Sequence, residues 1–136
     1  PREKIAKLLP FGLIGGCAVA LIIQLVAVPM MGLWGFRKGA LLAFRGIPLG
    51  IVLAWGPATI IFGAYFEYTR SFTARLLYIL AFAGIAAVIN YGFLRSGYLH
   101  HYRWSTLADF LLGAAVHSVL SVYLARFFYP GLPEES

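Results

Sequence analysis

The chain has 136 residues, of which 61% are hydrophobic and only 12% are charged, and its mean hydropathy is +0.83. Soluble domains carry about 25% charged residues, so this composition excludes an ordinary water-facing domain and predicts a membrane protein. The formal net charge of +6 then predicts contact with membrane lipids and not with nucleic acid.

The first apolar segment is predicted to span the membrane over residues 8–34, after a basic leader at residues 1–7. It contains no charged residue and one strongly polar residue, Gln24. It exceeds the roughly 20 residues that cross a bilayer, and it is too long for a cleavable signal peptide. Small residues recur at every fourth position, which places them on one helix face: Gly12, Gly16 and Ala20.

The second span is predicted over residues 47–68, after a basic connection at 35–46 that we expect along the membrane interface. Trp55-Gly56-Pro57 falls near its middle. Pro57 frees the carbonyl of Leu53, which must find another partner inside a membrane. This span also carries small residues at every fourth position: Gly50, Ala54 and Ala58.

The third and fourth spans are predicted over residues 75–94 and 106–129. Ser105 or Thr106 is expected to cap the last helix, with Asp109 in its first turn, where a carboxylate suits the helix dipole. Small or polar residues share one face of each helix: Ala83, Ala87 and Asn90 on the third; Asp109, Gly113, His117, Ser121 and Ala125 on the fourth. We therefore expect an all-α polytopic fold, a single domain of four transmembrane helices over residues 1–136.

A first candidate site lies at mid-membrane depth. An ionisable or amide side chain there is costly and usually faces the bundle interior. One interpretation is a ligand-binding pocket near His117. The other, which we favour, is that His117 forms an interhelical hydrogen bond, for example to Gln24, and only packs the helices together. The candidate residues are Gln24, Trp55, Pro57, His117, Ser118 and Ser121.

A second candidate site is a basic, aromatic-rich rim where loops one and three are expected to meet. Such a rim suits anionic lipid headgroups, although an ordinary interfacial anchor belt gives the same pattern. For Asp109, the alternative to a site role is a local ion pair with Arg103 or Arg95. The candidate residues are Arg37, Lys38, Asn90, Arg95, His100, His101, Arg103 and Asp109.

Motifs for catalysis and cofactors are weak. The adjacent His100 and His101 have no carboxylate or thiol at ligand spacing, so no metal site is predicted. A tetrapyrrole could use only His117 within a span. Cys17 is the only cysteine, which excludes an internal disulfide. We predict no catalytic residue and no cofactor, and the sequence is compatible with a bound lipid.

Two stretches, Ile47-Pro-Leu-Gly-Ile-Val-Leu-Ala-Trp55 and Ser96-Gly-Tyr-Leu-His-His-Tyr-Arg-Trp104, resemble a family of uncharacterised small multispanning membrane proteins of spore-forming Gram-positive bacteria. In that family a span bearing Pro and Trp precedes a Gly…Trp loop and a final span. The resemblance covers about half of the chain, and it implies a multi-helix fold without an assigned activity.

Three functions remain open at this point. The first is a non-enzymatic accessory subunit of a membrane assembly, or a homo-oligomer. The second is a small transporter or a lipid or small-molecule binding protein that uses the pocket at His117, Gln24 and Trp55. The third is an enzyme acting on lipid headgroups at the rim. We expect the chain in the bacterial inner membrane, with cytoplasmic termini.

Overall fold

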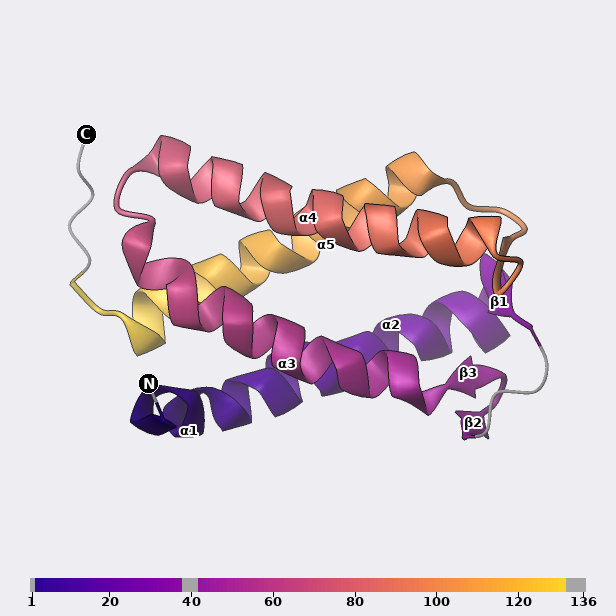
Figure 1. Ribbon diagram of the computed structural model, residues 1–136, viewed down its shortest axis with the longest axis horizontal. Coiled ribbons are helices and arrows are strands. Elements are labelled where there is room, and N and C mark those ends of the chain that lie inside the picture. Colours follow the sequence, from indigo (N-terminus) through magenta and orange to yellow (C-terminus); the bar gives the residue numbers. More distant parts are fainter. Residues whose placement is uncertain (1, 38–41, 132–136) are drawn as a thin grey trace.

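The computed structural model describes residues 2–37 and 42–131 (Figure 1). Within those residues, four helices are long and apolar enough to cross a membrane: Arg2–Met30, Leu49–Tyr68, Phe72–Arg95 and Thr106–Phe128. The structure thus has the predicted number of long apolar helices, in the predicted order. The first helix begins at Arg2, within the basic leader, and ends at Met30, before the predicted end of that span at residue 34.

Each long helix is built from shorter regular segments. The first comprises α1 (Arg2–Phe11), a π-helical stretch (Gly12–Ala18), α2 (Val19–Leu25) and a second π-helical stretch (Val26–Met30). The second comprises α3 (Leu49–Tyr65) and a 3₁₀ turn (Phe66–Tyr68), the third is α4 (Phe72–Arg95), and the fourth comprises α5 (Thr106–Tyr123) and a π-helical end (Leu124–Phe128). Ser105 is the cap of α5, because its hydroxyl accepts the Ala108 N–H at 3.1 Å.

The four helices form two pairs, the first helix with α3 and α4 with α5 (Figure 1). Glycine brings the first pair together: a Cβ at Gly16 would lie only 2.5 Å from the carbonyl oxygen of Trp55. In the second pair, a Cβ at Gly113 would lie 3.3 Å from the Cα of Ala83. Small residues allow such close backbone approach where lipid offers no hydrophobic drive for helix association.

The small residues of α3 lie in two different environments. Gly56, and not the row of Gly50, Ala54 and Ala58, faces the first helix, where a Cβ would meet the Cys17 Sγ at 2.8 Å. A Cβ at Gly50 would touch nothing within 4 Å. The carbonyl of Leu53, freed by Pro57, accepts a weak hydrogen bond from the Cys17 thiol at 3.8 Å.

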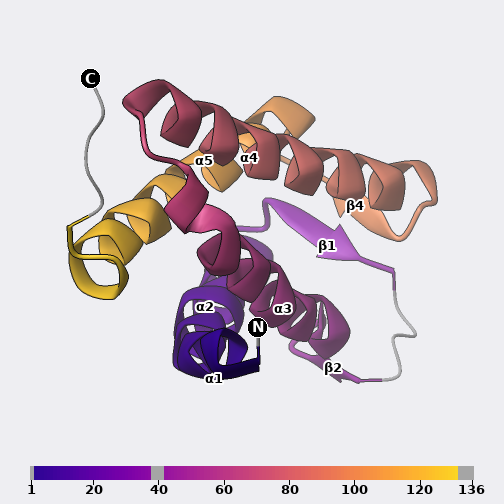
Figure 2. The ribbon, with the colours of Figure 1, turned by 60° about the vertical axis from the view of Figure 1, so that its left-hand side comes forward.

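Short strands tie the two helix pairs together at one end of the molecule. β1 (Trp34–Phe36) pairs antiparallel with β4 (Leu99–His101), and Figure 2 shows β1 lying between the helix pairs. Loops one and three therefore meet, as predicted. A hairpin of β2 (Ala43–Phe44) and β3 (Ile47–Pro48) turns through Arg45 and Gly46, which both have positive φ, the geometry of a tight two-residue turn.

The opposite end is closed by packed side chains. Its buried core comprises Leu8, Phe11, Phe62, Phe66, Ile79, Leu120 and Leu124. The Lys4 ammonium lies 2.7 Å from the Glu67 carboxylate and also bonds to the carbonyl of Ala64. The Tyr129 hydroxyl donates to the carbonyl of Gly63 at 2.9 Å. The start of the first helix, the α3–α4 turn and the end of the fourth helix thus meet at this end.

Candidate functional site

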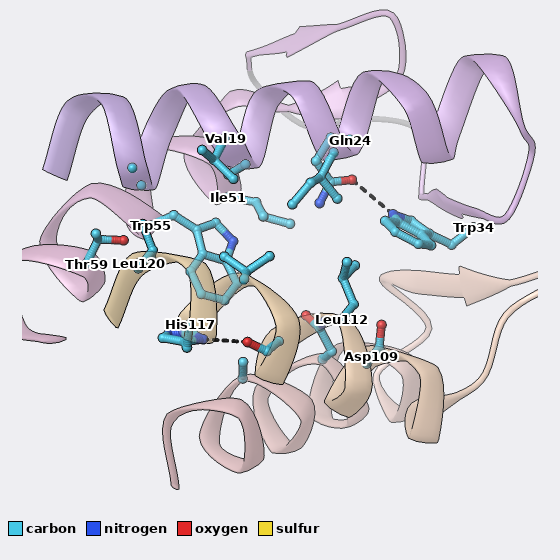
Figure 3. A pocket seen from close by; sticks show the side chains of 18 of the residues that line it. Val19, Gln24, Trp34, Ile51, Trp55, Thr59, Asp109, Leu112, His117 and Leu120 are labelled. Atoms are coloured by element: carbon cyan, nitrogen blue, oxygen red, sulfur yellow. Dashed lines mark hydrogen bonds between the residues drawn. The ribbon is translucent and has the colours of Figure 1, made fainter. Parts of the chain in front are cut away.

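A cavity of about 90 Å³ lies between the two helix pairs (Figure 3). We call it the inner cavity. Every long helix contributes to its wall, and so do β1 and β4. Its lining residues are Gly15, Gly16, Val19, Ala20, Ile23, Gln24, Trp34, Phe36, Ile51, Trp55, Thr59, Ala86, Asn90, Leu99, Asp109, Leu112, Gly113, Val116, His117 and Leu120. The π-helical stretch of the first helix carries two of them, and such stretches are frequent at functional sites.

Asp109 is the acidic residue of this wall. The helix start places it beside the loop after β4, where the Trp104 indole N–H donates to its Oδ1 at 2.8 Å. Its Oδ2 lies 3.4 Å from the His101 Nε2, but neither atom has a hydrogen-bond partner within the described residues. The alternative of a local ion pair with Arg103 or Arg95 is not what the structure shows within the described residues: Asp109 instead contacts Trp104 and His101, and both arginines are exposed.

Strand geometry separates the two adjacent histidines. In β4, Leu99 is buried, His100 is exposed and the His101 side chain is only 10% exposed. Successive side chains of a strand point to opposite faces. Pairing of His101 with Trp34 across β1 and β4 fixes this register, so that His101 alone reaches Asp109.

Gln24 and His117 both line the inner cavity but do not bond to one another, so the predicted His117–Gln24 hydrogen bond is wrong. The Trp34 indole N–H donates to Gln24 Oε1 at 2.9 Å. His117 Nδ1 lies 2.7 Å from the carbonyl oxygen of Gly113. Because a carbonyl only accepts, Nδ1 is the nitrogen that carries hydrogen (Figure 3).

His117 lies at the boundary between the inner cavity and the aromatic core. Its ring centroid is 4.9 Å from that of Phe62, 5.6 Å from that of Phe82 and 6.5 Å from that of Trp55. Trp55 covers the cavity side in Figure 3, whereas Phe62 and Phe82 belong to the packed end. The imidazole is therefore a packing residue on one side and a cavity wall on the other.

A larger hollow of about 590 Å³ lies beside the inner cavity, between α3 and α4. We call it the lateral groove. Its wall includes the small-residue row of α3, namely Gly50, Ala54 and Ala58, so these residues border the groove and not a neighbouring helix. The lining residues are Leu42, Pro48, Gly50, Ile51, Ala54, Trp55, Ala58, Ala86, Ile89, Asn90, Phe93 and Tyr98. Ile51, Trp55, Ala86 and Asn90 line both hollows.

The remaining predicted residues lie elsewhere. Pro57 and Ser118 are exposed, and the hydroxyl of buried Ser121 donates to the carbonyl of Ser118 at 2.9 Å. Of the predicted rim, Asn90, His101 and Asp109 gather at the inner cavity, while Arg37, Arg95, His100 and Arg103 are exposed. Lys38 lies outside the described residues.

Sequence reasoning missed Trp34, Phe36 and Thr59 as cavity residues. Trp34 and Phe36 lie at the end of the first predicted span and in the connection after it, and the pairing of their strand with β4 places them at the inner cavity. Thr59 lies one helical turn after Trp55, which is the one sequence signal that could have placed it on the same face.

Within residues 2–37 and 42–131, no group of three or more His, Cys, Asp or Glu side chains is arranged to hold a metal ion. Comparison of the chain with protein-family models, curated proteins and solved structures finds no match. The inner cavity and the lateral groove are therefore the features that bear on function.

Proposed function

We propose that the chain is an integral membrane protein of four transmembrane helices that binds a small amphiphilic molecule entering sideways from the bilayer. The observation that carries this proposal is the shared wall of the two hollows. The inner cavity has a mainly apolar wall that includes the polar side chains of Gln24, Asp109 and His117, and it adjoins the more apolar lateral groove across Trp55 and Asn90. A molecule with a polar head and an apolar chain matches both surfaces at once.

The sizes of the hollows support this division. Ligand pockets generally measure about 300–1,000 Å³, and the lateral groove of about 590 Å³ falls in that range. The inner cavity of about 90 Å³ equals about three water molecules at ~30 Å³ each. The groove therefore suits an alkyl chain, and the cavity suits a head of a few heavy atoms.

The outward surface supports placement in a bilayer. Large apolar side chains point away from the protein on several helices, including Ile14, Val88 and Val119, which are 68–70% exposed. Long runs of exposed apolar surface are unfavourable in water and favourable against lipid. Location in the bacterial inner membrane and cytoplasmic termini stay predictions.

Binding can be tested with an octyl amphiphile that carries bromine at the end of its chain. Bromine quenches nearby indoles, so binding in the groove is expected to quench Trp55 in the purified protein in lipid nanodiscs. Ala54→Phe fills the groove and should reduce quenching about tenfold at equal probe concentration, a loss of ~1.4 kcal/mol. Ala81→Phe adds the same ring on an exposed face of α4 outside the groove and should leave quenching unchanged. Equal quenching in both variants would refute binding in the groove.

A second candidate is the accessory subunit or oligomer predicted from the sequence. The row of Gly50, Ala54 and Ala58 supports it, because small residues of this kind commonly receive a neighbouring helix. In that case a helix of another chain, and not an alkyl chain, fills the lateral groove. Native mass spectrometry in mild detergent separates the two: a fixed chain-to-chain ratio lost in Ala54→Phe supports the subunit, whereas one chain with retained amphiphile supports binding.

A further inference from the structure

We infer that the head of the bound amphiphile is an organic cation, an ammonium group, and that Asp109 is its counter-ion. This inference rests on the proposed binding function and names the chemical class of its ligand. It is carried by a buried carboxylate oxygen in the cavity wall that the described residues leave without a hydrogen bond.

The carboxylate is half satisfied. Its side chain is only 7% exposed. Oδ1 accepts from Trp104, whereas Oδ2 has no hydrogen bond of good geometry within the described residues, although the Asn90 side chain and the His101 imidazole lie near the carboxylate. A buried carboxylate without a full set of partners is costly unless an opposite charge pairs with it. Because Asp109 also lines the inner cavity, a positively charged head placed there completes its environment.

His101 is a neighbour of this oxygen and not a hydrogen-bonded partner. Its Nε2 is 3.4 Å from Oδ2, but the two atoms do not form a hydrogen bond. The strand register with Trp34 holds the imidazole on one side of the carboxylate. The carboxylate also neighbours Asn90, and both residues line the inner cavity, where a ligand would meet them.

Aromatic rings favour an organic cation at the same place. Trp34 and Phe36 line the inner cavity together with Asp109, and the hydrogen bond from Trp34 to Gln24 fixes the orientation of the indole. Ammonium groups bind favourably over such rings. A carboxylate beside two rings is thus a chemically matched site for an alkylammonium head.

The same walls exclude other head groups. No Lys or Arg is among the residues that line either hollow, so an anionic head would meet Asp109 without a compensating charge. Calcium requires six to eight oxygen ligands, and within the described residues no group of three or more His, Cys, Asp or Glu side chains is arranged to hold a metal ion. A neutral head would bring no opposite charge to the Asp109 carboxylate.

The test compares three bromine-bearing octyl probes in nanodiscs of zwitterionic lipid: a trimethylammonium head, its uncharged tert-butyl analogue with carbon in place of nitrogen, and a sulfate head. We expect the ammonium probe to quench with at least tenfold higher affinity than the other two. Asp109→Asn has the same shape and can still accept from Trp104, and it should remove this preference. Glu3→Gln removes an equal charge at an exposed position and should preserve it.

The outcomes separate the two proposals. If all three probes bind equally to the original chain and Ala54→Phe still blocks them, amphiphile binding stands and the cationic head is refuted. A preference for ammonium that persists in Asp109→Asn also refutes the inference. If none of the probes binds the original chain, both proposals fail. The comparison of probes on the original chain does not depend on how well any variant folds.

Discussion

The two ends of this molecule treat their charged residues in opposite ways. At the closed end, the Lys4 ammonium contacts the Glu67 carboxylate at 2.7 Å, the Ala64 carbonyl, and the rings of Tyr68 and Tyr129. At the strand end, Asp109 meets one indole N–H, the side chain of Asn90 and a histidine nitrogen at 3.4 Å, and its Oδ2 has no hydrogen bond of good geometry within the described residues. The first end contains packed rings, and the second contains a cavity.

This difference identifies which charges serve the fold. A charge that the protein surrounds with partners, as at Lys4, has completed its interactions when folding ends. A charge that folding leaves incomplete, next to a cavity, is available to a ligand. The substitutions described next affect, in order, the helix crossing that both ends share, the boundary between them at His117, the strand end and the closed end.

The largest loss of stability is expected from Gly16→Leu, which places a large side chain where the first helix crosses α3. Even a Cβ at Gly16 would lie 2.5 Å from the Trp55 carbonyl oxygen, and backbone cannot yield as a flexible side chain does. We expect destabilisation of about 3 kcal/mol or more, at the upper end of overpacking, measured by thermal melting in detergent.

Gly92→Leu is the matched control for this substitution. A Cβ at Gly92 would touch nothing within 4 Å, so this variant should melt close to the original temperature. Similar losses in both variants would show that helix flexibility, and not the close crossing, requires glycine. Loss of the crossing is expected to disturb both ends together.

Much of this frame could be predicted from the sequence. The four spans, the Ser105 cap and the meeting of loops one and three follow from apolar length, capping chemistry and an even number of crossings. The need of the Leu53 carbonyl for a new partner followed from Pro57. These features depend on local chemistry, which a single sequence displays.

The side-chain partners could not be predicted in the same way. Helices that are apolar on every face carry no stripe that fixes their rotation, so Gln24 and His117 share a depth without facing one another. The contact of Asp109 with His101 could not be predicted, because the strand pairing that brings His101 inward joins residues far apart in the sequence. The inner cavity depends on these rotations, and therefore only part of its wall was foreseen.

The next largest effect is expected from His117→Ala, at the boundary of the two ends. Removing the imidazole leaves a void beside Phe62 and Phe82 and should cost about 2 kcal/mol, the low end for large-to-small core changes. The affinity for the ammonium probe should change less than threefold. Ser118→Ala is the control, since that side chain is exposed, and it should be neutral.

A different result would assign His117 another role. If His117→Ala melts normally but no longer binds the probe, the imidazole belongs to the ligand site, which is the ligand-pocket interpretation of the sequence. In that case the contact with Gly113 orients a binding group instead of satisfying a packing one.

Gln24→Leu is expected to have a smaller effect, at the strand end alone. It leaves the Trp34 indole N–H without its acceptor, which should cost about 1 kcal/mol in stability, the lower limit for a buried unsatisfied donor. A less fixed indole should also weaken binding of the ammonium probe about threefold, or ~0.6 kcal/mol. Binding of the uncharged analogue should be unchanged, because it gains little from the ring; an equal loss for both probes would instead indicate a general change of the cavity.

The smallest effect is expected at the closed end. Lys4 and Glu67 have side chains that are 31% and 36% exposed, so solvent screens their attraction. Lys4→Met or Glu67→Gln alone should therefore lower stability by less than about 1 kcal/mol. The exchanged pair, Lys4→Glu with Glu67→Lys, should recover part of that loss in thermal melting, since the attraction depends on opposite signs.

Binding of all three octyl probes should be the same in these variants as in the original chain. A closed-end variant that alters the preference for ammonium would show that the two ends are coupled, and that the charge at Lys4 contributes to the field at Asp109.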